Sequence, residues 1–242
     1  MAKKIQKISQ QRELQSSSPK DSETSLRRFT IVFFGASGVG KTSLILRFLG
    51  YAFNDNYSPT IEDFFIKHVF FNNETYELQI IDTSGTYEFP AMRKVDIAKG
   101  DAFVLVYSQD HPESFTKLNR YRSEILEGGK NRHPCIVVCN KNDLPLATHL
   151  GVLTDHRGLR ISAQHLVQTE WQSLWIDCSA KENSQVEDIF LRLMDEMKRA
   201  KHKVDTPGMS RKISSLLTIK KRPSSKASFN TIQIDSAVTK HL

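Results

Sequence analysis

The stretch GASGVGKT, Gly35 to Thr42, decides the fold. It fits the pattern G-x-x-x-x-G-K-[ST], follows the apolar run FTIVFF directly and opens the helical pattern KTSLILRFL. Gly35, Gly38 and Gly40 let the chain wrap closely, so that successive backbone N–H groups and a helix N-terminus face phosphate oxygens. The stretch therefore predicts a phosphate-binding loop. The alternative is a tight strand-to-helix turn with an incidental lysine.

Side chains of this loop predict a bound nucleoside triphosphate. Lys41 would reach the β- and γ-phosphates, and the Thr42 hydroxyl would ligate Mg²⁺. Ser37, Val39 and Ser43 complete the loop around the phosphates.

A second carboxylate for the metal is expected at the end of a neighbouring strand. The run LQIIDTSG supplies Asp82 there, with a water between carboxylate and metal, and Gly85 can offer a backbone N–H to the γ-phosphate. On its own DTSG is a weak signal, because Asp at a strand end is often a turn residue. Following a phosphate-binding loop, it predicts the metal side of the same site.

The stretch VVCNKND predicts which base is bound. Asp143 at a strand end can accept from both N1–H and the exocyclic amine of guanine, which adenine cannot satisfy. Asn140 would hold the loop and the base, and Lys141 would lie along the purine face. The stretch CSAK follows the next apolar run and would add Ser179, Ala180 and Lys181, with the Ala180 N–H directed to the guanine oxygen.

Strand-length and helix-length patterns alternate along the chain. From FTIVFFG onward, extended runs and helical runs follow one another, with one early hairpin formed by DFFIKHVFF and ETYELQIID. This order predicts an α/β fold, a P-loop NTPase domain with a mainly parallel six-stranded sheet and helices on both faces. Ligands of such sheets sit at the carboxyl ends of the strands. We expect one domain over residues 28–200.

The chain as a whole resembles a Ras-superfamily small GTPase of the Ras branch, from about Phe29 to Ala200. The stretches YSPTIEDF (57–64) and DTSGTYEFPAMR (82–93) resemble the two switch segments. Together with GAS in the loop, GDAFVLVYS, RKIS and RPS, they are most similar to the Rhes and dexamethasone-induced Ras group, with Di-Ras as neighbour.

The resemblance implies GTP/GDP and Mg²⁺ as cofactors. It also implies that Thr60 ligates the metal, that Tyr57 lies in the nucleotide site, and that effector proteins bind residues 57–65. Phe53 falls where the family stacks an aromatic ring on guanine, although it is also explained as a core residue. An exchange factor and a GTPase activator are implied without being identified.

Two departures bear on hydrolysis, for which Lys41, Gly85 and Thr86 are the candidate catalytic residues. Thr86 stands where the family commonly has a water-orienting glutamine, and Ser37 adds a side chain where efficient hydrolases have glycine. We therefore expect a signalling switch with slow GTP hydrolysis. The alternative is a GTP-loaded, effector-binding module with negligible turnover. Rap-type relatives also carry threonine and are regulated by partners. A small-substrate kinase would leave NKND and CSAK without a purpose.

The flanks differ from the centre in charge. Residues 1–27 and 201–242 carry net charges of +3 and +7, whereas the centre carries −3. We expect a disordered N-terminal extension and a basic flexible tail without a prenylation box, since no cysteine follows Cys178. Residues 198–226 would contact an anionic membrane, or be a solvated tail. With no interleaved aromatic residues, no nucleic-acid partner is expected. Composition favours a cytoplasmic monomer, peripheral at a membrane without a lipid anchor.

Overall fold

The structure is a computed structural model that describes residues 26–56, 59–86, 90–111, 113–144, 153–154 and 160–204. For 153–154, 160–161 and 201–204 it describes the backbone alone. Six strands form the main sheet in the order β2-β3-β1-β4-β5-β8. They are β1 (Arg27–Gly35), β2 (Glu62–Phe71), β3 (Glu74–Thr83), β4 (Ala102–Ser108), β5 (Cys135–Asn140) and β8 (Leu174–Asp177).

Strand directions follow from the connections. Long helical crossovers link β1, β3, β4, β5 and β8, which pair in parallel, whereas a tight turn at Asn72 and Asn73 joins β2 to β3 in an antiparallel hairpin. Asparagine tolerates the positive φ that both turn residues adopt, 49° and 63°. A separate two-stranded sheet pairs β6 (Leu153–Thr154) with β7 (Arg160–Ile161). The predicted fold class, with its early hairpin, is confirmed.

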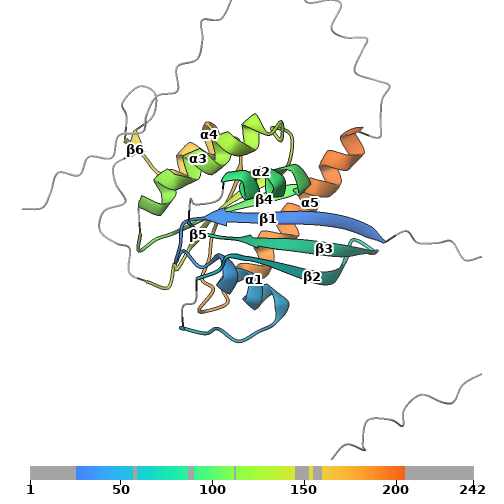
Figure 1. The fold of residues 1–242 in the computed structure, drawn as a ribbon, viewed down its shortest axis with the longest axis horizontal. Helices are drawn as coiled ribbons and strands as arrows, with labels where there is room; N and C mark the ends of the chain where they lie inside the picture. Colours follow the sequence, from blue (N-terminus) through green and yellow to red (C-terminus); the bar gives the residue numbers. More distant parts are fainter. Residues whose placement is uncertain are drawn as a thin grey trace, which may run out of the picture.

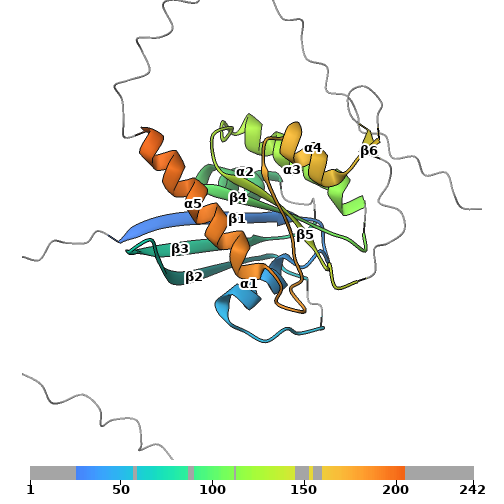
Figure 2. The same cartoon turned by 180° about the vertical axis from the view of Figure 1, so that it is seen from behind.

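Helices cover both faces of the sheet, as Figures 1 and 2 show from opposite sides. Apolar residues of α1 (Lys41–Leu49) and α5 (Val186–Val204) share one buried cluster with β1 and β3. Those of α2 (Pro90–Lys99), α3 (Glu113–Glu127) and α4 (Ala163–Thr169) belong to a second cluster on the other face. Parallel strands buried on both faces explain why β1 and β4 read as nearly continuous apolar runs.

The last helix packs as its periodicity predicts. Ile189, Leu193 and Met197 recur every four residues, and all three are buried, together with Phe190 and Met194 between them. Their stripe faces α1 and the sheet. Among the described helices, none is long and apolar enough to cross a membrane.

Element boundaries differ from the sequence expectations in a few places. β1 begins at Arg27 because Arg27 and Arg28 continue the ladder with β3 and pair with Glu74 and Glu77, at 3.2 and 2.6 Å. α5 continues to Val204, beyond the expected domain limit at 200. α2 had not been predicted as a helix, since only part of its short sequence is apolar. Most of the two flanks, 1–25 and 205–242, lies outside the described residues.

Candidate functional site

A pocket of about 560 Å³ opens at the carboxyl ends of the parallel strands, the edge toward which their arrows point in Figure 1. Most of the residues predicted to bind nucleotide line it: Ser37, Gly38, Gly40, Lys41, Thr42, Ser43, Phe53, Thr60, Gly85, Asn140, Lys141, Asp143, Ala180 and Lys181. Four others, Gly35, Val39, Asp82 and Ser179, do not line it, but each bonds to a residue that does. Tyr57 lies outside the described residues.

The lysine of the phosphate-binding loop is buried, with 6 % of its surface exposed. Its Nζ donates to the carbonyl oxygens of Gly35 and Ala36, at 2.9 and 3.1 Å, so the loop folds around its own ammonium group. Burial lowers the pKa of Lys41 to about 8, although the nearby charge of Asp82 opposes that shift. A phosphate in the pocket would supply the countercharge that backbone carbonyls cannot.

Two glycines let the surrounding loops meet. At Gly40 the backbone has φ of 96°, and a Cβ there would lie 2.2 Å from Nδ2 of Asn140. At Gly85 a Cβ would lie 2.3 Å from the backbone nitrogen of Ser37. Because neither position has room for a side chain, three strand-end loops pack directly against one another.

The metal-binding side is built from two hydroxyls and one carboxylate. Thr42 Oγ1 donates to Asp82 Oδ2 at 2.5 Å and lies 2.9 Å from the hydroxyl oxygen of Thr60. Asp82 is fully buried, and its Oδ1 has no hydrogen-bond partner among the described residues. Burial raises the pKa of Asp82, against the opposing effects of Thr42 and Lys41. Three hard oxygen donors and an unsatisfied buried carboxylate oxygen fit a divalent cation such as Mg²⁺.

Asn140 joins three loops at the base end of the pocket. It is buried, its Nδ2 donates to the carbonyl of Val39 at 2.8 Å, and its Oδ1 accepts from Ala180 N–H at 3.1 Å. The Ala180 N–H, which the sequence assigned to the guanine oxygen, is therefore already bonded to Asn140. If this N–H also contacted a guanine, Asn140 Oδ1 and the guanine oxygen would have to share it as acceptors.

Two further contacts orient the base-binding loop. Asp143 Oδ1 accepts from the Ser179 hydroxyl at 2.6 Å, which ties the carboxylate to the neighbouring loop. Lys141 takes a positive φ of 64°, and its Nζ pairs with Asp110 Oδ2 at 2.9 Å. Asp110 had not been predicted, although it follows β4 directly and strand ends of this sheet build the site. The lining residues Leu46, Ala52, Asn54, Asp55, Asn56 and Leu144 had not been predicted either.

The candidate catalytic residue Thr86 is placed differently from the rest. It is exposed, does not line the pocket, and its hydroxyl lies 2.9 Å from that of Ser84, which also accepts from the Thr86 N–H at 3.2 Å. The Thr86 side chain is thus occupied by a local contact. Ser37 is exposed in the pocket wall.

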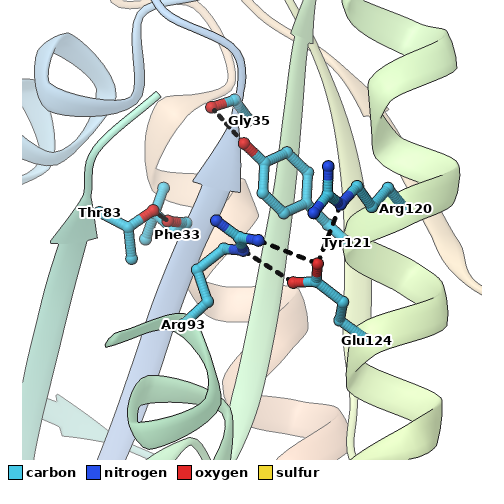
Figure 3. A network of polar contacts seen from close by, with 7 residues as sticks. All are labelled: Phe33, Gly35, Thr83, Arg93, Arg120, Tyr121 and Glu124. Atoms are coloured by element: carbon cyan, nitrogen blue, oxygen red, sulfur yellow. Dashed lines mark hydrogen bonds and ion pairs between the residues drawn. The ribbon is translucent and has the colours of Figure 1, made fainter. Parts of the chain in front are cut away.

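A polar network joins α2 and α3 and reaches the start of the phosphate-binding loop at Gly35 (Figure 3). Arg93 of α2 is buried and makes two bonds to Glu124 of α3, at 2.7 and 3.0 Å, and this bonding lowers the pKa of Glu124. On the same helix, the Tyr121 hydroxyl donates to the Gly35 carbonyl at 3.5 Å, the oxygen that Lys41 also contacts. The network connects the helix after Thr86 with the phosphate-binding loop through α3.

Comparisons with known proteins agree with this geometry. The family model described as Ras family matches residues 30–199. The human GTP-binding protein Rhes is 38 % identical over 196 residues, which is 77 % of this chain and 70 % of Rhes. Mouse GTP-binding proteins Di-Ras1 and Di-Ras2 are 35 % and 34 % identical, over 69 % and 71 % of this chain and 80 % and 82 % of theirs. The chain belongs to the Ras family of small GTPases.

Proposed function

We propose that this protein binds GTP and GDP together with Mg²⁺ and acts as a signalling switch that hydrolyses GTP slowly. The observation that carries the proposal is the convergence of four separate sequence motifs on one pocket of about 560 Å³. The phosphate-binding loop, the DTSG loop through Gly85, and the NKND and SAK loops meet there, and Thr60 joins them. The family membership and the names of the GTP-binding relatives support the same activity.

At the phosphate end, Lys41 would bind the β- and γ-phosphates as a countercharge. Thr42 and Thr60 would ligate Mg²⁺ directly, and Asp82 would do so through a water. When bound, Mg²⁺ neutralises phosphate charge.

Thr42→Asn should lower GTP affinity more than GDP affinity, because the larger amide replaces a hydroxyl needed at the metal. Titrations of both nucleotides test this, and an unchanged GTP to GDP preference contradicts it.

At the base end, Asp143 would accept from the two guanine donors while Ser179 holds one of its oxygens. Lys141, fixed by Asp110, would lie along one face of the purine and Phe53 would contact the base. Phe53 also packs against the hydrophobic core, so it can serve both as a core residue and as a contact for the base. This arrangement supports selectivity for guanine over adenine, since adenine would leave a carboxylate unpaired.

Slow hydrolysis is supported by the placement of Thr86. Its short side chain is bonded locally to Ser84 and lies outside the pocket lining, so it is poorly suited to orient a water beside the γ-phosphate. The same observation favours a second function, a GTP-loaded module whose turnover has no role. Single-turnover hydrolysis of bound GTP separates the two, and so does the nucleotide that co-purifies. Turnover with GDP bound at rest supports the switch, whereas persistent GTP supports the module.

The effector surface would include residues 57–65 and continue along β2. Phe64, Ile66 and Phe70 are 54 %, 52 % and 72 % exposed on one face of this edge strand. Exposed apolar side chains gathered on one face are typical of interaction sites. An exchange factor and a GTPase activator would regulate the cycle of a monomeric, cytoplasmic protein that has no nucleic-acid partner.

Residues 198–226 would attract the protein to an anionic membrane through their positive charge. Vesicle sedimentation of the full chain and of a chain lacking 201–242 tests this part. Binding that is insensitive to salt, or that survives the deletion, contradicts it.

A further inference from the structure

A second cleft lies at the opposite end of the sheet from the nucleotide pocket. It has a volume of about 1570 Å³ and lies between the C-terminal parts of α3 and α5 and the turn that precedes β8. In both views the C-terminal ends of these helices point to the same end of the molecule (Figures 1 and 2). Its wall is mixed, with apolar Leu126, Trp171 and Leu174 beside basic Arg122 and Lys130.

The cleft is lined by four basic and three acidic side chains, which gives it a formal net charge of +1. Three basic side chains that line it, Arg122, Lys130 and Arg132, make no ion pair with any described residue. Of its acidic residues, Glu196 pairs with Arg199 at 3.0 Å, Asp101 accepts from the Thr30 N–H at 2.8 Å and keeps its charge, and Glu170 has a contact of its own. An excess of positive charge with a low-dielectric wall attracts anions.

Arg122 is the best-placed of these groups. It is half-buried, its guanidinium lies 5.3 Å from the ring centre of Trp171, and burial lowers its pKa. Trp171 in turn stacks on Phe115, with ring centres 5.6 Å apart and planes 5° from parallel. A planar guanidinium held on a fixed ring keeps its N–H donors oriented for bidentate bonds to an oxyanion.

Lys130 adds a second charge at the wall of the cleft. Its Nζ donates to the Gly100 carbonyl at 3.1 Å and lies 3.5 Å from His133 Nε2. Burial and the neighbouring Lys130 charge lower the pKa of His133, and the charge of Asp101 opposes that shift. The ammonium group lies against the Gly100 carbonyl and the imidazole and makes no ion pair with a described residue.

We propose that this cleft binds the phosphate groups of an inositol phosphate, either free or as the headgroup of a phospholipid. Arg122 forms the bidentate contact, Lys130 and Arg132 add charge, and Leu126, Trp171 and Leu174 pack against the less polar part of the ligand. The site is separate from the nucleotide pocket and is a function additional to GTP binding. α5 ends at Val204 beside the cleft lining residues Met197 and Ala200, and the basic segment follows it in sequence.

The test uses the full chain loaded with GDP and Mg²⁺, so that the nucleotide pocket does not compete for phosphate. Calorimetric titration with inositol trisphosphate measures the free ligand. Sedimentation with phosphatidylcholine vesicles, with and without phosphatidylinositol bisphosphate, measures the lipid-borne one. Arg122→Gln should weaken binding about tenfold, the size expected for losing a charge-assisted bidentate contact. The affinity of Arg122→Lys should lie between those of wild type and Arg122→Gln, because lysine retains the charge but lacks the planar guanidinium group.

Two controls distinguish binding at this cleft from attraction by the overall positive charge of the protein. Lys94→Gln removes one exposed positive charge of α2 outside the cleft and should leave binding unchanged, and unchanged GDP release from each variant shows an intact fold. Arg122-dependent binding of inositol trisphosphate supports a site for the free ligand, and Arg122-dependent binding of vesicles alone supports the lipid headgroup. Equal binding by wild type and Arg122→Gln overturns the proposal, as does an equal loss in Lys94→Gln or no binding of either probe.

Discussion

The loops that line the nucleotide pocket and Thr86, which follows the lining residue Gly85, are built differently. Lys41, Asp82 and Asn140 are all buried; Lys41 bonds to the backbone of its own loop, whereas Asp82 and Asn140 bond to residues of other loops. Thr86, only four residues beyond Asp82, is exposed and bonded to its near neighbour Ser84. Asp82 and Asn140 are thus fixed by contacts between distant parts of the chain, whereas the Thr86 side chain is fixed by a local one.

This difference has a physical consequence for how mutations change nucleotide affinity and the rate of hydrolysis. Changes among the buried groups leave polar atoms unsatisfied and disturb several loops together. A change at Thr86 alters one exposed side chain and leaves the binding loops intact. Affinity and turnover should therefore respond independently to mutation, and the predictions below test that separation from the strongest expected effect to the weakest.

Asn140→Ala should weaken GDP binding most. The change removes the bonds to Val39 and Ala180 and leaves a buried carbonyl and N–H unpaired, at about 1–1.5 kcal/mol each. We expect about a hundredfold faster release of fluorescent GDP, corresponding to roughly 2.7 kcal/mol. Asn142→Ala, an exposed asparagine in the same loop, is the matched control. Similar release from both variants would show that the buried bonds do not set affinity.

Asp143→Asn should lower guanine-nucleotide affinity at least tenfold, a loss of about 1.4 kcal/mol, because an amide cannot accept from both guanine donors. Competition titrations with GTP and xanthosine triphosphate measure the change. Xanthine carries a carbonyl in place of the exocyclic amine, so an asparagine that donates to it should recover affinity for that base. Undiminished GTP affinity would remove the basis for assigning Asp143 to the base.

Local sequence was enough to predict the main sheet, the hairpin and most of the residues that line the pocket. GASGVGKT, DTSG and NKND each follow an apolar run, and strand ends of a parallel sheet meet at one edge. Tyr57 and residues 87–89 lie outside the described residues, so their expected roles stay predictions.

Features that depend on contacts between distant elements were not predictable in this way. The Arg93–Glu124 pair joins residues 31 positions apart on two helices, one of which was not expected. Asp110 pairs with Lys141 from a different strand end, and the Ala180 N–H bonds to Asn140. The hydrogen bond of Thr86 to Ser84 is local, yet the sequence does not predict it. The backbone conformation after Gly85 determines whether the Thr86 side chain bonds to Ser84 or enters the pocket.

The pH dependence of nucleotide affinity should report Lys41. Its folded-state pKa of about 8 lies below the ordinary value of 10.5, and only the protonated form attracts phosphate. Affinity should be nearly constant below pH 7 and fall as pH rises through 8, by about tenfold between pH 7 and pH 9. Titrations across that range test the slope, and Lys41→Arg should flatten it because a guanidinium stays charged. A flat profile in wild type would mean that Lys41 does not lose its proton in this range.

Thr86→Gln should have the smallest effect, and it should raise the rate of GTP hydrolysis, whereas the changes above lower nucleotide affinity. A glutamine amide can accept from water and donate to phosphate at once, across a span that the threonine hydroxyl cannot reach. We expect single-turnover hydrolysis to rise about threefold, or roughly 0.7 kcal/mol in activation free energy, with Ser37 still limiting the rate. GDP affinity should stay unchanged, because Thr86 lies outside the pocket lining. Thr86→Val, which removes the hydroxyl without adding an amide, is the control and should not accelerate hydrolysis. A slower Thr86→Gln enzyme would show that another residue orients the water, with Tyr57 and Tyr87 as the candidates, and would break the separation between binding and turnover.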